Sequence, residues 1–279
     1  MGLLGSSVTL AILRSSRGIK AVGYSHRDQT RQKARKIGVA DVIADDPAEC
    51  VAQADVVILA TPICTFETIF EQIAPELKDG AIITDVGSTK SMPHKWAANK
   101  LGKNVHYVGS HPIAGSEHSG LEFARDDLFS GSRCILTKNA RTDSSAIETL
   151  KDFWKLVGCS VSVMTPAEHD KIFATVSHVP HITAAALVNA SRDDHVKYSG
   201  KGFIDTTRVS SGPENVWSDI LMTNPANIAR GIDRVIKELT KFRDAITSDS
   251  QTKIEKLLQN ARMKRAKLIE YKMRNKELI

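Results

Sequence analysis

The stretch Gly2-Leu3-Leu4-Gly5-Ser6-Ser7 opens the chain and leads into an apolar segment that runs to about Leu13. The composition of this segment predicts a helix that begins beside the two glycines. A second apolar run, Ile19-Lys20-Ala21-Val22-Gly23-Tyr24, predicts a strand that ends at Ser25. A glycine turn, a helix and a strand therefore follow one another at the very start of the sequence.

This order is typical of a Rossmann unit, in which a glycine-rich turn after the first strand holds the pyrophosphate of a dinucleotide. Gly2 and Gly5 have the spacing of the second and third glycines of that motif. The second glycine lets the backbone approach the pyrophosphate, the third lets the helix pack on the sheet, and the N–H groups of the helix start face the phosphates. The first glycine and the first strand would precede Met1, so we expect a sheet whose first strand is missing.

Two continuous apolar runs, residues 55–60 and 81–86, predict buried parallel strands, and a helical pattern from Phe66 to about Leu77 lies between them. We therefore expect an α/β fold with a Rossmann-like, doubly wound parallel sheet. Ligands of such sheets bind beyond the carboxyl ends of the strands. Four residues that follow the two strands are expected at this cofactor edge: Thr61, Pro62, Gly87 and Ser88.

The strand pattern stops at about Pro166, and helical patterns cover residues 167–189, 215–222, 227–248 and 251–277. We therefore predict two domains, a dinucleotide-binding domain over residues 1–165 and an all-helical substrate and dimerisation domain over residues 166–279.

Composition restricts the classes of function. The 279 residues are 42% hydrophobic and 25% charged, with a net charge of +6, of which the segment from Arg262 to Ile279 supplies +5 through seven basic and two acidic residues. A basic tail can attract nucleic acid or an anionic metabolite. The sequence has no aromatic-rich RNA-binding motif, helix-turn-helix signature or zinc finger, so we expect no nucleic-acid partner. No stretch approaches the ~20 apolar residues that cross a bilayer, so we expect no membrane partner either.

The cysteines and the N-terminus point to a cytoplasmic protein. Four scattered cysteines without a C-x-x-C pair are typical of reduced thiols. Residues 1–6 also match the M-G-x-x-x-S pattern of N-myristoylation, and the apolar run to Leu13 resembles part of a signal peptide. No basic segment precedes that run and no small-residue cleavage site follows it, and the dinucleotide motif explains both glycines.

The end of the predicted second strand indicates which dinucleotide binds. An acidic residue there would bind the ribose 2′-hydroxyl of NAD, but this chain has Ser25, His26 and Arg27. A neutral residue beside cations suits a 2′-phosphate, so we expect NADP in preference to NAD. The alternative, that His26 and Arg27 are merely exposed loop residues, stays open.

Four further segments carry a resemblance to a known family. They are D-V-G-S-T-K at 85–90, G-S-H-P-I-A-G-S-E-H-S-G at 109–120, S-H-V-P-H at 177–181 and D-T-T-R at 205–208. In order and spacing they resemble the prephenate/arogenate dehydrogenase family over essentially the whole chain. The resemblance implies transfer of a hydride from ring C4 of prephenate or arogenate to the nicotinamide, with loss of the ring carboxylate as CO2. It also implies a homodimer with the active site in a cleft between the domains.

The resemblance also implies roles for individual residues. His111 would accept a hydrogen bond from the C4 hydroxyl as a neutral imidazole, and Ser88 would lie near both the nicotinamide and the substrate. Arg208 would bind the side-chain carboxylate of the substrate, because a guanidinium binds carboxylates bidentately. His181 would lie near the substrate, and Glu117 would orient the glycine-rich loop or gate the site.

Each role has a structural alternative. His111, which is expected in a loop, could make only a structural hydrogen bond. Ser88 could cap a helix, and Glu117 and Arg208 could be surface charges. Trp217 is interpreted as a packing or dimer contact, and His178 as a neighbour of His181. No carboxylate or cysteine completes a metal site with these two histidines, so we expect no metal.

Two other functions stay open. One is a different Rossmann dehydrogenase that acts on a 3-hydroxy acid, and the other is an N-terminally truncated, non-catalytic fragment that still dimerises. No single residue distinguishes prephenate from arogenate as the preferred substrate.

Overall fold

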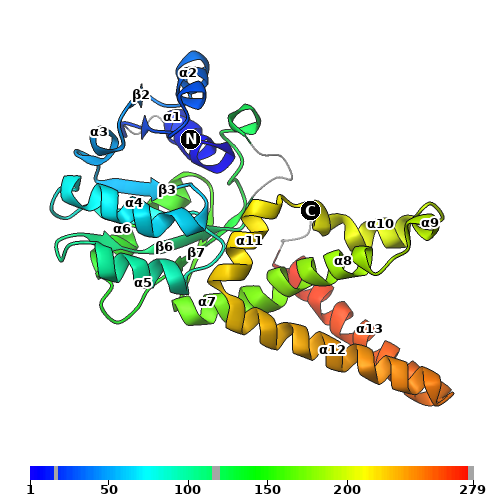
Figure 1. The fold of residues 1–279 in the computed structure, drawn as a ribbon. Helices are drawn as coiled ribbons and strands as arrows, with labels where there is room; N and C mark the ends of the chain where they lie inside the picture. The colour runs from blue at the N-terminus through cyan, green and yellow to red at the C-terminus, as the bar shows by residue number, and fades with distance from the viewer. Residues whose placement is uncertain (16–17, 115–119, 276–279) are drawn as a thin grey trace. The chain divides into compact units, whose positions relative to one another are not determined.

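The computed structural model describes residues 1–15, 18–114 and 120–275, and Figure 1 shows the order of their elements. The first five strands pair in parallel, as the sequence predicts. In the first sheet β1 (Val22–Gly23) pairs with β2 (Val42–Ile43). In the second sheet the parallel strands lie in the order β3 (Val56–Leu59), β4 (Ile82–Asp85) and β5 (His106–Tyr107). In the described chain no ladder joins β1 to β3, and β1 is shorter than the run predicted over residues 19–24.

A third sheet departs from the all-parallel expectation. Strand β7 (Arg133–Thr137) pairs antiparallel with β6 (Gly109–Pro112) and parallel with β8 (Ser160–Met164). An antiparallel pair needs no helical crossover. The described residues between β6 and β7 accordingly contain no α-helix, only a short 3₁₀ turn, Leu121–Phe123, and a further turn over residues 126–131. This sheet places His111 on a strand, where the sequence predicts a loop.

Helices cover the strands and bury two main apolar clusters. One cluster joins α1 (Leu3–Ser15) and α6 (Ser144–Leu156) around the fully buried Trp154. The other forms where α4 (Phe66–Ile73) lays Phe66 and Phe70 against β3 and β4. The remaining helices of this part are α2 (Asp28–Ile37), α3 (Pro47–Val51) and α5 (Ser91–Lys100).

Buried polar groups fix the end of β4. The Lys90 ammonium pairs with the Asp85 carboxylate, and both side chains are fully buried. Tyr107 Oη donates to the other Asp85 oxygen at 2.7 Å, and the Gly87 N–H donates to the first at 2.7 Å. Because a buried carboxylate is stable only when its lone pairs are satisfied, these contacts hold the segment from Asp85 to Lys90 in one conformation.

Every regular element after β8 in the described chain is a helix, as predicted (Figure 1). Helix α7 (Pro166–Phe173) begins with a capping box between Thr165 and Glu168 and has proline at its first position. A π-helical segment (Ala174–His178) joins it to α8 (Val179–Asn189), so the helix predicted over residues 167–189 is not regular throughout. The later helices are α9 (Asp193–Val196), α10 (Lys201–Thr207), α11 (Glu214–Thr223), α12 (Pro225–Thr247) and α13 (Gln251–Arg274).

Contacts divide the chain into two compact units, Met1–Ile228 and Ala229–Ile279. The first unit includes α7 and α11 because both are bonded to the strand-rich part: Asp170 accepts from the backbone of Ser91, and Thr89 bonds to Thr223 at 2.8 Å. The domain boundary after residue 165 stays a prediction.

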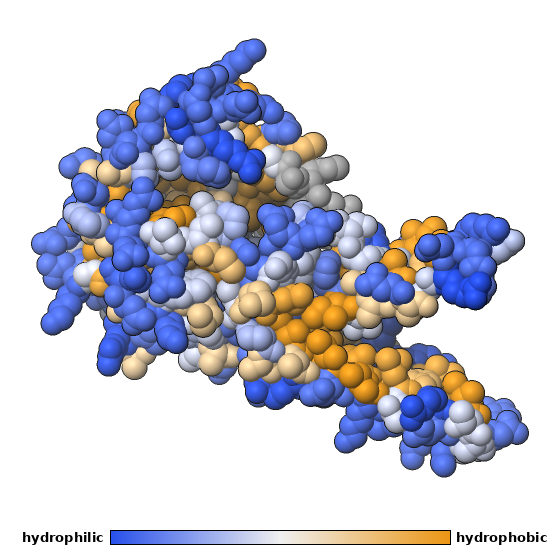
Figure 2. Space-filling model, in the orientation of Figure 1, coloured by the Kyte–Doolittle hydropathy of each residue, from blue (hydrophilic) through white to orange (hydrophobic). Residues whose placement is uncertain are grey.

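Large apolar side chains remain exposed along the last two helices. Figure 2 shows them as orange patches along α12, where Ile236, Leu239 and Ile246 are 55%, 61% and 62% exposed. On α13 the exposed apolar side chains are Leu258, Met263, Leu268, Tyr271 and Met273. Exposed apolar surface of this kind marks an interaction site.

One helical run of the described chain, Pro166–Asn189, is long and apolar enough by composition to cross a membrane, with 28% of the tested window buried. The expectation that no segment comes near this limit is therefore wrong for this run. The run contains His169, Asp170 and His178, which are at most 1% exposed. A core helix of a folded domain meets the same test, and the absence of a membrane partner stays a prediction.

Replacing Lys90 by methionine tests the importance of the buried pair. We expect Lys90→Met to lower the free energy of unfolding by about 3–5 kcal/mol, because it leaves a buried carboxylate without its counter-ion. The control is Lys78→Met, which removes a pair with Asp55 whose side chains are 36% and 91% exposed and should cost at most ~1 kcal/mol. Urea unfolding followed by circular dichroism measures both variants, and equal losses would contradict the prediction.

Candidate active site

A chain of hydrogen bonds connects two histidines and an aspartate. His111, on β6, places its Nδ1 2.8 Å from Nε2 of His169 on α7. His169 Nδ1 lies 2.9 Å from Oδ1 of Asp170. Phe173, one helical turn later, packs its ring against both imidazoles, with ring centroids 4.6 Å from His111 and 4.4 Å from His169. The strand and the helix therefore present one aligned His–His–Asp group.

Asp170 also holds the start of helix α5. Its Oδ1 accepts from the backbone N–H of Lys90 at 2.8 Å, and its Oδ2 accepts from that of Ser91 at 2.8 Å. The first N–H groups of a helix have no partner within the helix, and a carboxylate at this end also interacts favourably with the helix dipole. Asp170 thus supplies from another element the cap that α5 does not make for itself. The interpretation of Ser88 as the N-cap is wrong, since α5 begins only at Ser91.

Burial determines the charge states in this group. It lowers the pKa of His111 well below its ordinary value, and the neighbouring His169 and Lys90 lower it further. Burial also lowers the pKa of His169, although Asp170 acts in the opposite direction. For Asp170 burial favours the neutral acid, but hydrogen bonds from His169 and Ser91 outweigh it and lower the pKa. At neutral pH the group is therefore two neutral imidazoles and one carboxylate.

His178 is connected to the group through Asn224. Asn224 donates through Nδ2 to the backbone carbonyl of Asp170 at 2.8 Å and lies 3.4 Å from His178 Nδ1. Burial lowers the pKa of His178 to about 4, while Asp170 and the Ser88 carbonyl act in the opposite direction. His178 is thus a buried part of the site and not only a neighbour of His181.

His181 lies on the same helix and stacks on Trp217, with ring centroids 3.4 Å apart and planes 11° apart. The Trp217 ring also meets His178 edge-on at 6.4 Å. Trp217 is therefore a site residue that bridges the two histidines within its own chain. Burial lowers the pKa of His181, and the Val209 carbonyl acts in the opposite direction. That carbonyl belongs to the exposed 3₁₀ turn Arg208–Ser211, so the turn that carries Arg208 packs beside His181.

The predicted cofactor residues lie apart from this group, at the start of α1 and the ends of β1 and β3. A methyl group added at Gly5 would lie 3.1 Å from Ala60 Cβ, so the helix packs on the end of β3 as closely as the third glycine of the motif allows. Gly2 has open space around it, and Ser6 Oγ is buried without a hydrogen-bond partner in the described chain. These features fit the site of a dinucleotide pyrophosphate.

The other predicted cofactor residues differ in exposure. Ser25 is buried, and its carbonyl accepts from the Arg31 guanidinium at 2.8 Å. His26, Arg27, Thr61 and Pro62 are exposed. Glu117 lies outside the described residues. Within the described part of the chain no group of three or more His, Cys, Asp or Glu side chains could hold a metal ion.

The sequence alone did not single out His169, Asp170 or Asn224. The only local signal is a His–Asp pair in the first turn of a helix that follows Thr165-Pro166, and such a pair is usually solvent-exposed. Their importance depends on contacts with residues 58 and 80 positions away along the chain.

Known proteins match the chain over nearly its whole length. A family model described as the nucleotide-binding domain of prephenate dehydrogenase matches residues 8–163, and one described as its dimerization domain matches residues 165–260. The prephenate dehydrogenase of Bacillus subtilis is 34% identical over 94% of this chain and 72% of its own length. The cyclohexadienyl dehydrogenase of Zymomonas mobilis is 32% identical, over 89% of this chain and 87% of its own.

A solved structure shares the fold. The Aquifex aeolicus prephenate dehydrogenase, crystallised with hydroxyphenyl propionate and NAD+, superposes with a TM-score of 0.88 at 32% identity, covering 96% of this chain and 95% of that one.

Proposed function

The chain belongs to the prephenate/arogenate dehydrogenase family, and from this premise we propose that it oxidatively decarboxylates prephenate or arogenate in tyrosine biosynthesis. The His111–His169–Asp170 group carries the proposal, because it supplies one neutral imidazole of the kind the reaction needs. Because the chain belongs to this family, the alternative that it is a dehydrogenase for 3-hydroxy acids is set aside.

The reaction removes a hydride from ring C4 and releases the ring carboxylate as CO2 as the ring becomes aromatic. A nicotinamide dinucleotide, when bound, accepts the hydride. Because aromatisation drives the loss of CO2, the protein needs mainly to favour departure of the hydride. Positive charge develops at C4 during this step, and a hydrogen bond from the C4 hydroxyl to the His111 imidazole stabilises it. The phenolic product retains that proton.

The other site residues would bind and orient. Arg208 would bind the side-chain carboxylate of the substrate, because the 3₁₀ turn that carries it packs beside His181. We assign contact with the substrate to His181, held in place by its stack on Trp217. Ser88 would lie between substrate and nicotinamide. Glu117 would orient the loop that follows His111.

The dinucleotide would be held by Gly2 and Gly5 at the start of α1, by Thr61 and Pro62 after β3, and by the segment Ser25–Arg27 after β1. We propose NADP as the preferred cofactor. In support, no carboxylate follows β1 directly, and Arg27 is exposed beside the buried Ser25. Arg31 is already occupied by Asp28 and Asp45, at 3.1 and 3.2 Å, which leaves the 2′-phosphate to Arg27.

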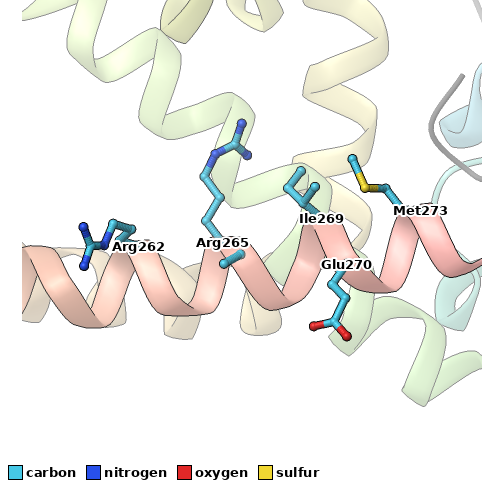
Figure 3. Close-up of a pocket in the computed structure, with 6 residues that line it drawn as sticks. Arg262, Arg265, Ile269, Glu270 and Met273 are labelled. Carbon is cyan, nitrogen blue, oxygen red and sulfur yellow. The ribbon is translucent and has the colours of Figure 1, made fainter.

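We also propose that the chain acts as a cytoplasmic homodimer. Residues 165–260 match a dimerization domain, and apolar side chains lie exposed on α12 and α13. Figure 3 shows Arg265, Ile269 and Met273 on one side of α13, where they line a groove with Arg262, Ala266 and Glu270. Free thiols at Cys50, Cys64, Cys134 and Cys159 fit a reducing compartment.

The role of His111 is tested by turnover and its pH dependence. With prephenate or arogenate, kcat/KM should stay constant as pH falls through 6.5, the ordinary pKa of histidine, and decline only in more acid solution, since burial lowers the His111 pKa and the neutral ring is the active form. His111→Asn should lower kcat by about 10²–10⁴-fold. Formation of the reduced dinucleotide, followed by absorbance, measures both.

The matched control is His195→Asn, at a side chain that is 67% exposed, and it should leave turnover unchanged. An acid limb at or above pH 6.5, or a fully active His111→Asn chain, would refute the role. Failure of the unsubstituted chain with both substrates and both dinucleotides would favour a non-catalytic, dimerising fragment.

Cofactor preference is tested by the ratio of kcat/KM for NADP to that for NAD. We expect a ratio above one that falls about tenfold or more in Arg27→Ala, because the variant loses a charge-assisted contact with the 2′-phosphate. Arg141→Ala, which removes an exposed arginine before α6, should keep the native ratio. A native preference for NAD would overturn the proposal.

The dimer is tested by sedimentation equilibrium. Leu239→Glu should raise the dissociation constant by about two orders of magnitude, since a carboxylate would be buried without a partner in the apolar contact. Lys237→Glu, on a different face of α12, should leave the constant nearly unchanged. Equal effects of the two substitutions would exclude the apolar face of α12 as the contact.

A further inference from the structure

The hydrogen-bond chain behind His111 has a direction that its chemistry imposes. An ionised carboxylate only accepts hydrogen bonds. Asp170 is held in that form by the Lys90 and Ser91 N–H groups, which donate to Oδ1 and Oδ2 at 2.8 Å each. The hydrogen between His169 Nδ1 and Asp170 Oδ1 must therefore belong to His169.

The protonation of His169 in turn determines the protonation of His111. A neutral imidazole has a single N–H, so a His169 that donates through Nδ1 has a lone pair at Nε2. That lone pair faces His111 Nδ1 across 2.8 Å. The hydrogen in this bond must come from His111, which is then protonated at Nδ1 and bears its own lone pair at Nε2.

We propose that Asp170 and His169 are positioning residues that fix the catalytic tautomer of His111. The inference rests on the proposed function, in which His111 accepts a hydrogen bond from the C4 hydroxyl. With the opposite polarity Nε2 would carry a hydrogen and would donate to the hydroxyl oxygen, which would oppose the developing positive charge at C4. The two bonds therefore decide whether His111 promotes or hinders loss of the hydride.

The surrounding contacts keep this polarity fixed. Phe173 packs on both rings and restricts their rotation, with its plane 25° from that of His169. The Asn224 side chain donates a hydrogen bond to the backbone carbonyl of Asp170. The buried Lys90 ammonium is paired with Asp85 and not with Asp170. Asp170 also caps the start of α5, so the carboxylate that orients the hydrogen bonds of His169 and His111 also holds α7 against α5.

Imidazole nitrogen NMR tests the tautomer without any substrate. In the full-length chain labelled with ¹⁵N-histidine, His111 should show a protonated Nδ1 and an unprotonated Nε2 at neutral pH. Its signals are identified among those of the nine histidines by their loss in His111→Asn. A protonated Nε2, or an even mixture of the two tautomers, would overturn the proposal.

Two substitutions of His169 test the consequence for catalysis. His169→Leu removes both hydrogen bonds and should lower kcat by about 100-fold or more, with KM for the substrate changed less than about threefold. His169→Gln can still donate to Asp170 and accept from His111, and it should retain most of that activity. Full activity of His169→Leu, or equal losses in both variants at unchanged thermal stability, would contradict the positioning role.

Turnover and the NMR spectrum test the proposed function and the positioning role separately. If the unsubstituted chain turned over neither substrate, the proposed function would fail, while the NMR spectrum would still determine the tautomer. If turnover were normal but His111 carried its hydrogen on Nε2, only the positioning role would be lost. The spectrum of the unsubstituted chain also decides the question if His169→Leu does not fold.

Discussion

The carboxylate of Asp170 is the contact on which the candidate site depends. It accepts from the first N–H groups of α5, from His169, and from no solvent, since the residue is 1% exposed. A buried carboxylate in water-free surroundings needs several donors, and the start of a helix supplies them at fixed positions. The helical segment after β8 is thereby attached to the strand-rich part at the place where the His–His–Asp group forms.

A second buried charge stabilises the segment that joins β4 to α5. Asp85 ends β4 and is neutralised by Lys90, with Tyr107 and Gly87 as further donors. Asp85 and Asp170 thus both bond to Lys90, one through its side chain and the other through its backbone. Because neither charge can be left alone in the interior, the residues between β4 and α5 have little conformational freedom, and Ser88 is held in place with them.

Desolvation gives the site its chemical character. The histidines gathered here have pKa values lowered first of all by burial, so they serve as hydrogen-bond acceptors and donors and not as cations. A neutral ring suits a reaction in which positive charge develops on the substrate. The same burial makes the direction of each hydrogen bond important, because a buried donor or acceptor that points the wrong way is left without a partner.

The sequence by itself determined the α/β class, the run of helices after Pro166 and the family, because these depend on local periodicity and on motifs contiguous in the chain. It also singled out His111, although it predicted a loop where β6 forms. Only the tertiary structure decided that His169, Asp170 and Asn224 join His111 and that Trp217 stacks on His181. These contacts link segments far apart in the sequence, and their energies come from burial and hydrogen-bond geometry, which no local pattern of residues encodes.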